Sequence, residues 1–381
     1  MLTVNGGWHI RILRVVSDLY PHVVGGLGLH AHEISKWQSE HGNEVKVISI
    51  RGSKTNGFKR SYEVQEFNSI MKPKGNAIAP SMLNAILKQQ KDYDILHAHS
   101  HLFFSTNMGA FARRIGDSPL VITNHGMIST NMPKWVQDIY MPTIAKWTLE
   151  SAERIICYTK EDAEAVMKLG IAEGRIAIIH NGVDIELFSP QPRESSDVVR
   201  LVWSGRFVPG KGVDTLIDAF ALALKEEPKL HLLLVGDGPQ KDQIEAQIAR
   251  LNIKDKVTIN TYVPNNEMPN IYRDSSIFVL TSHYEGVPRT ILESMACGLP
   301  VICTDLPQLR PIVGGHGMLV PVYSAKGFAE AILALASDES MRRRMGASGS
   351  ELIRTSYSWD SAMRETIELY KTVIEERKRP W

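Results

Sequence analysis

Short apolar runs rich in β-branched residues alternate with longer amphipathic runs along nearly the whole chain, and this alternation is the strongest constraint on its fold. The apolar runs have the length and composition of strands, as in IRILRVVSD, YDILHAHS, PLVITNHG, RLVWSG, LHLLLVGDG and SIFVLTS. Strands that alternate with helices pair in parallel, with the helices covering both faces of the sheet. We therefore expect an α/β protein built from doubly wound parallel sheets.

The domain organisation follows from the number of strands. About eleven strand-like runs are too many for one ordinary open sheet, so we expect two sheets. The polar, Pro- and Ser-rich stretch FSPQPRESSDVV separates two strand–helix series. We predict one domain over residues 1–188, a second over residues 198–360, and a helix over residues 361–381 that packs back on the first domain. Two such domains would face a cleft, and parallel sheets place ligands at the carboxyl ends of their strands.

Composition excludes several classes of partner. Lys and Arg number 43 against 42 Asp and Glu, a net charge of +1, so we expect no nucleic-acid partner. No apolar run reaches the roughly 18 residues of a membrane span. The start MLTVNGGWHIRILRVV lacks the pattern of a signal peptide, and the three cysteines have no metal-ligand spacing. We therefore expect a cytoplasmic protein with reduced cysteines.

A glycine-rich loop follows the strand-like run RLVWSG. Arg206 and Lys211 lie there among glycines, and a helix-like run comes next. Glycines let a backbone approach a ligand closely, and a helix N-terminus favours anions. The context favours a diphosphate site; the alternative is a solubilising loop with glycine turns.

The stretch HYEGVPRTILESMACG also follows a strand-like run and opens a helix. Glu285 precedes this helix and Glu293 lies within it. A carboxylate at such a place can bind a vicinal diol, as an acidic residue binds ribose in dinucleotide folds. The alternative is that both glutamates only complement the helix dipole. The backbone amides that could face an anion belong to Val287, Arg289, Thr290 and Ile291.

One strand-like segment contains histidines and aspartates that could bind a metal ion, but we do not favour a metal site there. His97, His99 and His101 alternate at the end of one strand, but no nearby acid or cysteine completes a ligand set. Asp92 and Asp94 form a D-x-D at the start of the same strand, the wrong end for a ligand. We expect no metal and assign these histidines to substrate contact or packing.

Further residues lie after strands, where a ligand is expected. His125 follows one strand, and Gly236 and Gly238 follow another as a phosphate or base wall. Gly26 opens a G-x-G-x-x-A match to a dinucleotide fingerprint, but LYPHVVG intervenes between it and the strand. We interpret this segment as a flexible loop that meets a phosphate or an acceptor.

The motifs, taken in order, resemble the retaining nucleotide-sugar glycosyltransferases of glycosyltransferase family 4. They are VGGLGLHAHEI, HAHSH, TNHG, HNGVD, GRFVPGKG, VGDGP and YEGVPRTILESMACGLPVICTD, across nearly the whole chain. The resemblance implies the GT-B fold, with two Rossmann-like domains, an acceptor-side domain at 1–188 and a nucleotide-sugar-binding domain at 198–360. It also implies retention, no cofactor and metal-independent catalysis.

The resemblance implies residue roles as well. Glu285 would contact hydroxyls of the donor sugar, Glu293 would bind ribose, and Arg206 and Lys211 would hold the diphosphate. Gly26 would lie near the phosphates.

His125 would lie beside the transferred sugar, and His30 and His99 are candidates for contact with the acceptor. This chain departs from the family pattern at GVP, where Gly-Phe-Gly is usual, and at Arg310–Pro311, where a Pro-Glu pair is usual.

The expected reaction moves a sugar from a nucleotide diphosphate, a UDP-sugar by family frequency, to a hydroxyl of a glycan, glycolipid or small polyol. Alternatives are a GDP-mannose-dependent mannosyltransferase, a nucleotide-sugar epimerase and a non-catalytic nucleotide-sugar binder. Residues 51–74 hold six basic and two acidic residues. Such a surface could meet anionic lipid on the inner face of the membrane near a lipid-linked acceptor; the alternative is an ordinary solvated loop.

Overall fold

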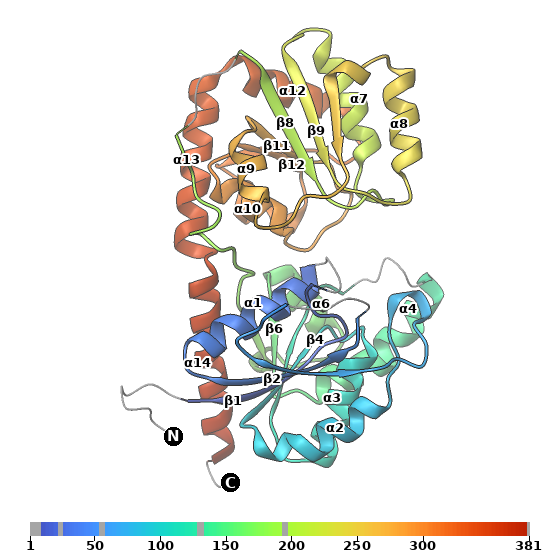
Figure 1. The fold of residues 1–381 in the computed structure, drawn as a ribbon, viewed down its shortest axis with the longest axis vertical. Helices are drawn as coiled ribbons and strands as arrows, with labels where there is room; N and C mark the ends of the chain where they lie inside the picture. The colour runs from blue at the N-terminus through green and yellow to red at the C-terminus, as the bar shows by residue number, and fades with distance from the viewer. Residues whose placement is uncertain (1–8, 22–25, 53–57, 128–132, 193–196, 379–381) are drawn as a thin grey trace. The chain divides into compact units, whose positions relative to one another are not determined.

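The computed structural model describes residues 9–21, 26–52, 58–127, 133–192 and 197–378, and the chain divides into two compact units (Figure 1). Unit 1 comprises Met1–His180 and Met363–Trp381, and unit 2 comprises Asn181–Ala362. Each unit contains one parallel sheet with helices packed against it.

The division between the units lies earlier than the predicted boundary at residue 188. Arg273 of unit 2 donates hydrogen bonds of 2.8 Å to the carbonyl oxygens of Leu187 and Ser189. The backbone amide of Val183 donates to the carbonyl of Tyr357 at 2.9 Å. These bonds attach the stretch after His180 to unit 2, which the composition of the stretch did not reveal.

The sheet of unit 1 has seven strands among the described residues, in the order β3-β2-β1-β4-β5-β6-β7, and every neighbouring pair is parallel. The strands are β1 Arg11–Val15, β2 Glu44–Ile50, β3 Glu63–Phe67, β4 Ile95–His99, β5 Leu120–Thr123, β6 Arg154–Cys157 and β7 Ile176–Ile178. The α-helices are α1 Gly26–Glu40, α2 Ser81–Gln89, α3 Phe104–Ile115, α4 Lys134–Tyr140, α5 Lys146–Glu150, α6 Lys160–Lys168 and most of α14 Trp359–Lys378. Shorter turns are η1 Pro73–Gly75, η2 Gln90–Asp92, the π-helical η3 Met141–Ala145 and η4 Glu173–Arg175.

The two faces of this sheet carry different residues because side chains alternate along a strand. Leu13, Leu96 and Ile122 pack on one face into a core with Ile86 and Val166 of the covering helices. Burying such side chains contributes about 1.5–3 kcal/mol each. The next residue along β1 and β4 points to the opposite face, and there the chain places polar groups.

A buried polar network joins that second face to α1 and α14. Arg14 is fully buried; its guanidinium donates to Ser35 Oγ at 2.6 Å and to Gln38 Oε1 at 2.8 Å. The hydroxyl of Tyr370 on α14 lies 2.5 Å from His97 Nδ1 and 3.4 Å from Arg14 Nη2. Burial lowers the pKa of Arg14. The hydroxyl of Tyr370 thus attaches α14 to Arg14 of β1 and His97 of β4.

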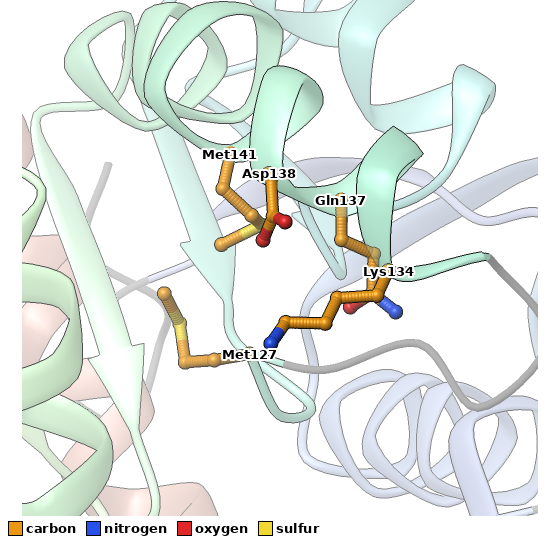
Figure 2. Close-up of a pocket in the computed structure, with 5 residues that line it drawn as sticks. All are labelled: Met127, Lys134, Gln137, Asp138 and Met141. Carbon is orange, nitrogen blue, oxygen red and sulfur yellow. The ribbon is translucent and has the colours of Figure 1, made fainter.

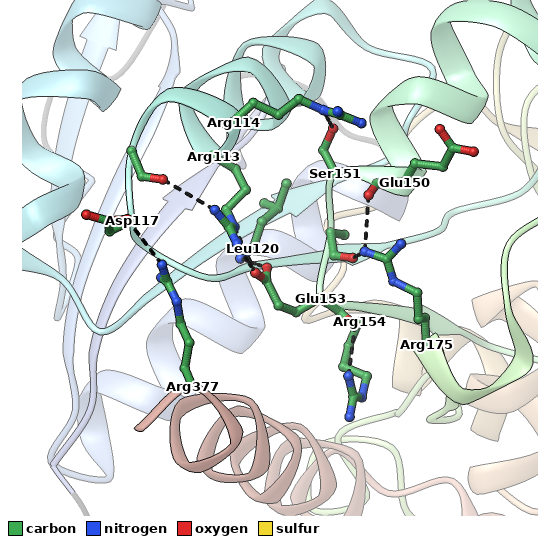
Figure 3. Close-up of polar contacts among 12 residues, drawn as sticks. Arg113, Arg114, Asp117, Leu120, Glu150, Ser151, Glu153, Arg154, Arg175 and Arg377 are labelled. Carbon is green, nitrogen blue, oxygen red and sulfur yellow. Dashed lines mark hydrogen bonds and ion pairs between the residues drawn. The ribbon is translucent and has the colours of Figure 1, made fainter. Parts of the chain in front are cut away.

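Two ion pairs hold the C-terminal end of α14 to the same unit, and Figure 3 shows the pair of Arg377 with Asp117. Arg154 donates to Glu376 at 2.6 Å, and Arg377 lies 3.5 Å from Asp117. These pairs are largely exposed and contribute about 1 kcal/mol or less each. The buried hydrogen bonds of Tyr370 and Arg14 are the stronger attachment.

The sheet of unit 2 has six strands among the described residues, in the order β10-β9-β8-β11-β12-β13, and they also pair in parallel. The strands are β8 Val199–Ser204, β9 Leu230–Val235, β10 Val257–Asn260, β11 Ile277–Leu280, β12 Val301–Thr304 and β13 Gly317–Val320. The helices are α7 Val213–Leu224, α8 Lys241–Arg250, α9 Met268–Arg273, α10 Arg289–Ala296, α11 Arg310–Val313, α12 Ala325–Ser337 and α13 Glu339–Ser356, with the short turns η5 Lys254–Lys256 and η6 Pro307–Leu309.

The core of unit 2 lies between its sheet and the paired helices α7 and α12. Trp203 of β8 and Phe220 of α7 are fully buried there, together with Phe328 of α12. Cys157, Cys297 and Cys303 are buried thiols outside any disulfide, as predicted. Among the described helices, none is both long and apolar enough to cross a membrane. The predicted α/β architecture of parallel sheets is confirmed in both units.

Replacing Tyr370 by Phe tests the attachment of α14. The variant loses the buried hydroxyl that meets His97 Nδ1, which keeps only its 3.3 Å contact with Arg14 Nη2, so the free energy of unfolding should fall by about 0.5–1.5 kcal/mol. Urea denaturation measures this change, and Tyr323→Phe is the control because Tyr323 is 69% exposed. Equal stability of the two variants would contradict the role given to Tyr370.

Candidate functional site

The loops after β8 and β11 meet at a Lys–Glu ion pair in unit 2. Lys211 Nζ lies 2.5 Å from Glu285 Oε1, which also accepts a hydrogen bond of 2.6 Å from Ser282 Oγ. β8 and β11 are neighbours in the sheet, so their carboxyl ends open side by side. The backbone amide of His283 donates to the carbonyl of Gly210 at 2.8 Å and joins the two loops. Two residues predicted from separate motifs are thus brought into contact.

Glycines allow this close approach. Gly212 has a φ of 64°, and a Cβ atom there would lie 2.1 Å from the carbonyl oxygen of Thr281. A Cβ on Gly236, directly after β9, would lie 1.9 Å from the carbonyl oxygen of Gly205. No side chain fits at such distances, so these positions require glycine. The loops after β8, β9 and β11 therefore form one tightly packed edge of the sheet.

Two other predicted residues lie on this edge. Gly238 has a φ of 155°, and a Cβ there would lie 2.4 Å from the carbonyl oxygen of Phe207. Arg206 is exposed in the loop after β8, five residues before Lys211. A guanidinium in that place is free to follow an anion that binds at the loop.

Helix α10 begins at this edge. Pro288 precedes it in an extended conformation, Cys297 caps its end and Gly298 follows with a φ of 79°, as the sequence predicted. The amide of Ile291 is not free as we predicted, because it donates to the carbonyl of Pro288 at 3.1 Å. This bond tightens the first turn.

Three amides of the predicted set are left at the start of α10. The amides of Val287, Arg289 and Thr290 donate to no backbone carbonyl in the part of the chain that the structure describes. These three N–H groups supply the positive end of the helix dipole.

Glu293 lies on α10, buried to 4% exposure, inside a hydrogen-bond network. Its two carboxylate oxygens accept from the Tyr272 hydroxyl at 3.3 Å and from Arg289 Nε at 3.4 Å. Tyr272 also contacts Ser204 Oγ at 3.1 Å. Burial raises the pKa of Glu293, and Arg289 opposes that rise. Each carboxylate oxygen has two lone pairs, so Glu293 can still accept hydrogen bonds from a ligand.

In unit 1, a second cluster lies at the ends of three neighbouring strands. His99 ends β4, His125 follows β5, and Tyr158 follows β6. His30 joins them from α1, which begins at the exposed Gly26. His99 Nδ1 lies 3.1 Å from His125 Nε2. The structure thus brings together all three histidines that the sequence proposed for the sugar and the acceptor.

Burial favours the neutral forms of His99 and His125 in this cluster. Burial lowers the pKa of His125 to about 3, and burial followed by neighbouring histidines lowers the pKa of His99 well below its usual value. The Tyr158 hydroxyl lies 3.2 Å from His125 Nδ1 and fixes the orientation of that ring. A neutral imidazole of fixed orientation can donate one hydrogen bond and accept another from a substrate hydroxyl.

Unit 1 also has a surface depression, lined by Met127, Lys134, Gln137, Asp138 and Met141 (Figure 2). Met127 follows His125 by two residues, and the other four come from α4 and η3. Ammonium, amide and carboxylate groups together can donate to and accept from hydroxyls.

Sequence reasoning missed several residues of both clusters. Tyr158 had a detectable signal, because it directly follows a strand in RIICYT. Ser282 and Tyr272 contact the two glutamates, and the side chain of Gln308 donates to the carbonyl of Glu285. Tyr272 and Gln308 come from other elements, and no local pattern indicated them.

Two family models match adjoining parts of the chain. The model described as Glycosyltransferase Family 4 matches residues 24–187, and the model described as Glycosyl transferases group 1 matches residues 184–352. Two Rossmann-like α/β units with these matches define a glycosyltransferase of the GT-B fold. The chain belongs to the glycosyltransferases of the family 4 type, as its motifs predicted.

Relatives and solved structures agree with this assignment. A D-inositol 3-phosphate glycosyltransferase of Kribbella flavida is 29% identical over 74% of this chain and 72% of its own length. A second, of Kineococcus radiotolerans, is 25% identical over 93% and 92%. The structure of Anabaena HepE in complex with UDP and glucose superposes with a TM-score of 0.80 at 20% identity, covering 96% of this chain and 100% of that one. Sucrose-phosphate synthase of Thermosynechococcus elongatus gives 0.79 at 21%, covering 96% and 100%.

The buried histidines predict a loss of stability in mild acid. Burial lowers the pKa of His101 to about 4 and that of His125 to about 3. An unfolded histidine has a pKa of about 6.5, so below that pH the unfolded chain binds protons. The folded chain keeps these histidines neutral until the pH is much lower. The free energy of unfolding therefore falls as the pH falls below about 6.5. At pH 5.5 the loss should be about 1 kcal/mol for each such histidine.

Urea denaturation at pH 7.5 and 5.5 measures this loss. His101→Gln should reduce the difference between the two pH values, whereas His41→Gln should not, because His41 is exposed. Stability that is equal at both pH values, or higher at pH 5.5, would contradict the prediction.

Proposed function

We propose that the protein transfers a sugar from a UDP-sugar to a hydroxyl acceptor with retention of configuration and without a metal ion. The observation that carries the proposal is the contact of Lys211 with Glu285 beside the free amides at the start of α10. A cation and a helix N-terminus favour a diphosphate, and a carboxylate next to them favours sugar hydroxyls.

The proposed chemistry follows the charge that develops as the glycosidic bond breaks. Negative charge grows on the leaving diphosphate, and Lys211, Arg206 and the amides of α10 would stabilise it. Lys211 has three N–H donors, so it can hold a phosphate oxygen while it keeps its contact with Glu285. The sugar carbon becomes oxocarbenium-like. We propose attack from the face of the leaving group, whose phosphate helps to deprotonate the acceptor.

Glu293 is proposed to bind the ribose of the donor. Tyr272 and Arg289 hold its two oxygens in fixed directions, which reduces the entropy lost when a diol binds. Gly236 and Gly238, without side chains, would admit the nucleotide to the adjacent loop.

The choice of UDP rests on likeness alone. Structures of Anabaena HepE contain UDP and UDP-glucose. GDP-mannose remains the alternative donor.

The acceptor is proposed to bind in unit 1, near His125, His30 and His99. The depression lined by Lys134, Gln137 and Asp138 offers groups for a polyhydroxylated molecule. The relatives are named for D-inositol 3-phosphate, a phosphorylated polyol. A glycan, a glycolipid or a small polyol carries the same hydroxyl chemistry.

We also propose contact with the inner face of a membrane. It rests on the basic stretch 51–74, of which residues 53–57 lie outside the described part of the chain. Lys72 lies 3.2 Å from Asp18, and Arg60 donates to the carbonyl of Tyr20 at 3.0 Å. Part of the basic charge is thus already engaged within unit 1.

Lys211→Met tests the donor site. Removing the cation that would face the leaving diphosphate should lower kcat by about 100- to 1000-fold. The control is Lys326→Met, whose side chain is 85% exposed on α12 of the same unit. Thermal melts of both variants separate catalysis from folding. A folded Lys211→Met enzyme with wild-type turnover would refute the assigned role.

A donor panel tests the reaction. Thermal shifts with UDP, GDP and ADP identify the base, since a ligand at 100 times its Kd stabilises the fold by about 2.7 kcal/mol. Once the donor is known, NMR of the product should show that the transferred sugar has the same anomeric configuration as in the donor. EDTA should not reduce the rate of transfer. An inverted product would refute retention. An epimerised sugar without acceptor, or binding without turnover on any acceptor, would favour the alternatives.

A further inference from the structure

Three imidazoles lie close together in unit 1, those of His30, His99 and His125. The proposed transfer does not require that the three act together. Their ring centroids lie 5.6 Å apart for His30 and His99, 5.0 Å for His30 and His125, and 5.4 Å for His99 and His125. One nitrogen of each ring lies within 4.8 Å of the others. Three imidazoles bound to one zinc ion, at Zn–N distances of about 2.0–2.1 Å and tetrahedral angles, place their ring centroids roughly 5 Å apart.

We propose that His30, His99 and His125 are the protein ligands of a zinc site in unit 1. The sequence did not predict it, because the alternating His97, His99 and His101 contribute only one ligand. His30 comes from α1 and His125 from the loop after β5, so the set exists only in the folded sheet.

The surroundings of the rings fit a ligand set. The Tyr158 hydroxyl lies 3.2 Å from His125 Nδ1, the nitrogen on the far side of the ring from the Nε2 that meets His99. A partner of this kind fixes the tautomer of a metal-binding histidine and directs its lone pair to the metal.

His99 faces His125 through its Nδ1. Its side chain is fully buried, and its Nε2 has no hydrogen-bond partner in the part of the chain that the structure describes. Both ring nitrogens of His101 are unpartnered among the described residues as well, so the ring geometry and the contact of Tyr158, and not this nitrogen, carry the proposal.

The ligand chemistry selects the class of metal. Imidazole nitrogens alone suit Zn²⁺, Co²⁺, Ni²⁺ and Cu²⁺, and not the oxygen-binding Mg²⁺ or Ca²⁺. Three ligands leave a fourth position for water or a substrate oxygen.

Zinc at this site would inhibit the transfer. Coordination consumes the lone pair of His125 and so prevents it from accepting a hydrogen bond from the sugar or the acceptor. This consequence rests on the proposed function, whereas metal binding itself does not. The site is therefore compatible with a transfer reaction that needs no metal.

Cobalt substitution tests the site in the full-length protein. Metal-free protein, prepared with EDTA and dialysed, should bind one Co²⁺ with the strong visible absorption of a tetrahedral site, and Zn²⁺ should displace it. X-ray absorption of the zinc-loaded wild type should give three imidazole ligands. Fewer than three would overturn the proposal without the need for any variant.

Variants locate the site. His30→Gln and His125→Gln should each weaken Zn²⁺ binding at least 100-fold, and Tyr158→Phe should weaken it roughly 10-fold. His101→Gln and His41→Gln are matched controls outside the set and should retain wild-type affinity. Equal affinities of His30→Gln, His41→Gln and the wild type would place the metal elsewhere and refute the proposal.

An activity assay separates this proposal from the proposed function. Zinc that binds as described without slowing transfer would leave the site intact and refute the role of His125 in transfer. Failure of zinc to bind would refute the site and leave the proposed transfer unaffected.

Discussion

The parallel pairing of strands within each unit is the constraint on which the other features depend. Because all strands of a sheet run one way, their carboxyl ends and the loops that follow open on one edge. In unit 2 this edge brings Lys211 and Glu285 within 2.5 Å although 74 residues separate them. In unit 1 it gathers His99, His125 and Tyr158 from β4, β5 and β6. Each cluster is a direct product of sheet geometry, and glycines such as Gly212 let the loops meet without steric conflict.

The two clusters differ in their electrostatics. The cluster of unit 2 combines a cation, a carboxylate and helix amides, so it is suited to an anion and its sugar. In the cluster of unit 1, burial lowers the pKa values of His99 and His125 and so favours their neutral forms. Neutral imidazoles offer lone pairs to a hydroxyl proton or to a transition metal. If both proposals hold, substrate and zinc would compete for His125.

Much of this organisation was predictable from local sequence. The alternation of strand-like and helix-like runs predicted two parallel α/β sheets, and the order of the motifs predicted the family. The position of Gly298 predicted the end of α10. The boundary between the units was misplaced, because Arg273, far along the chain, fixes residues 187 and 189 to unit 2. The amide of Ile291 was assigned wrongly, because the first turn of α10 closes on Pro288.

The sequence by itself determined the class of fold, the family and the residues that follow each strand, because these depend on local periodicity and on short motifs. Only the tertiary structure decided which of those residues meet. It brought His30 next to His99 and His125. It placed Tyr272 and Arg289 in contact with Glu293. It buried Arg14 against Tyr370, with no carboxylate partner for Arg14 among the described residues. These contacts join positions that are distant in the chain, and their geometry is set by strand order and helix packing, which no local pattern contains.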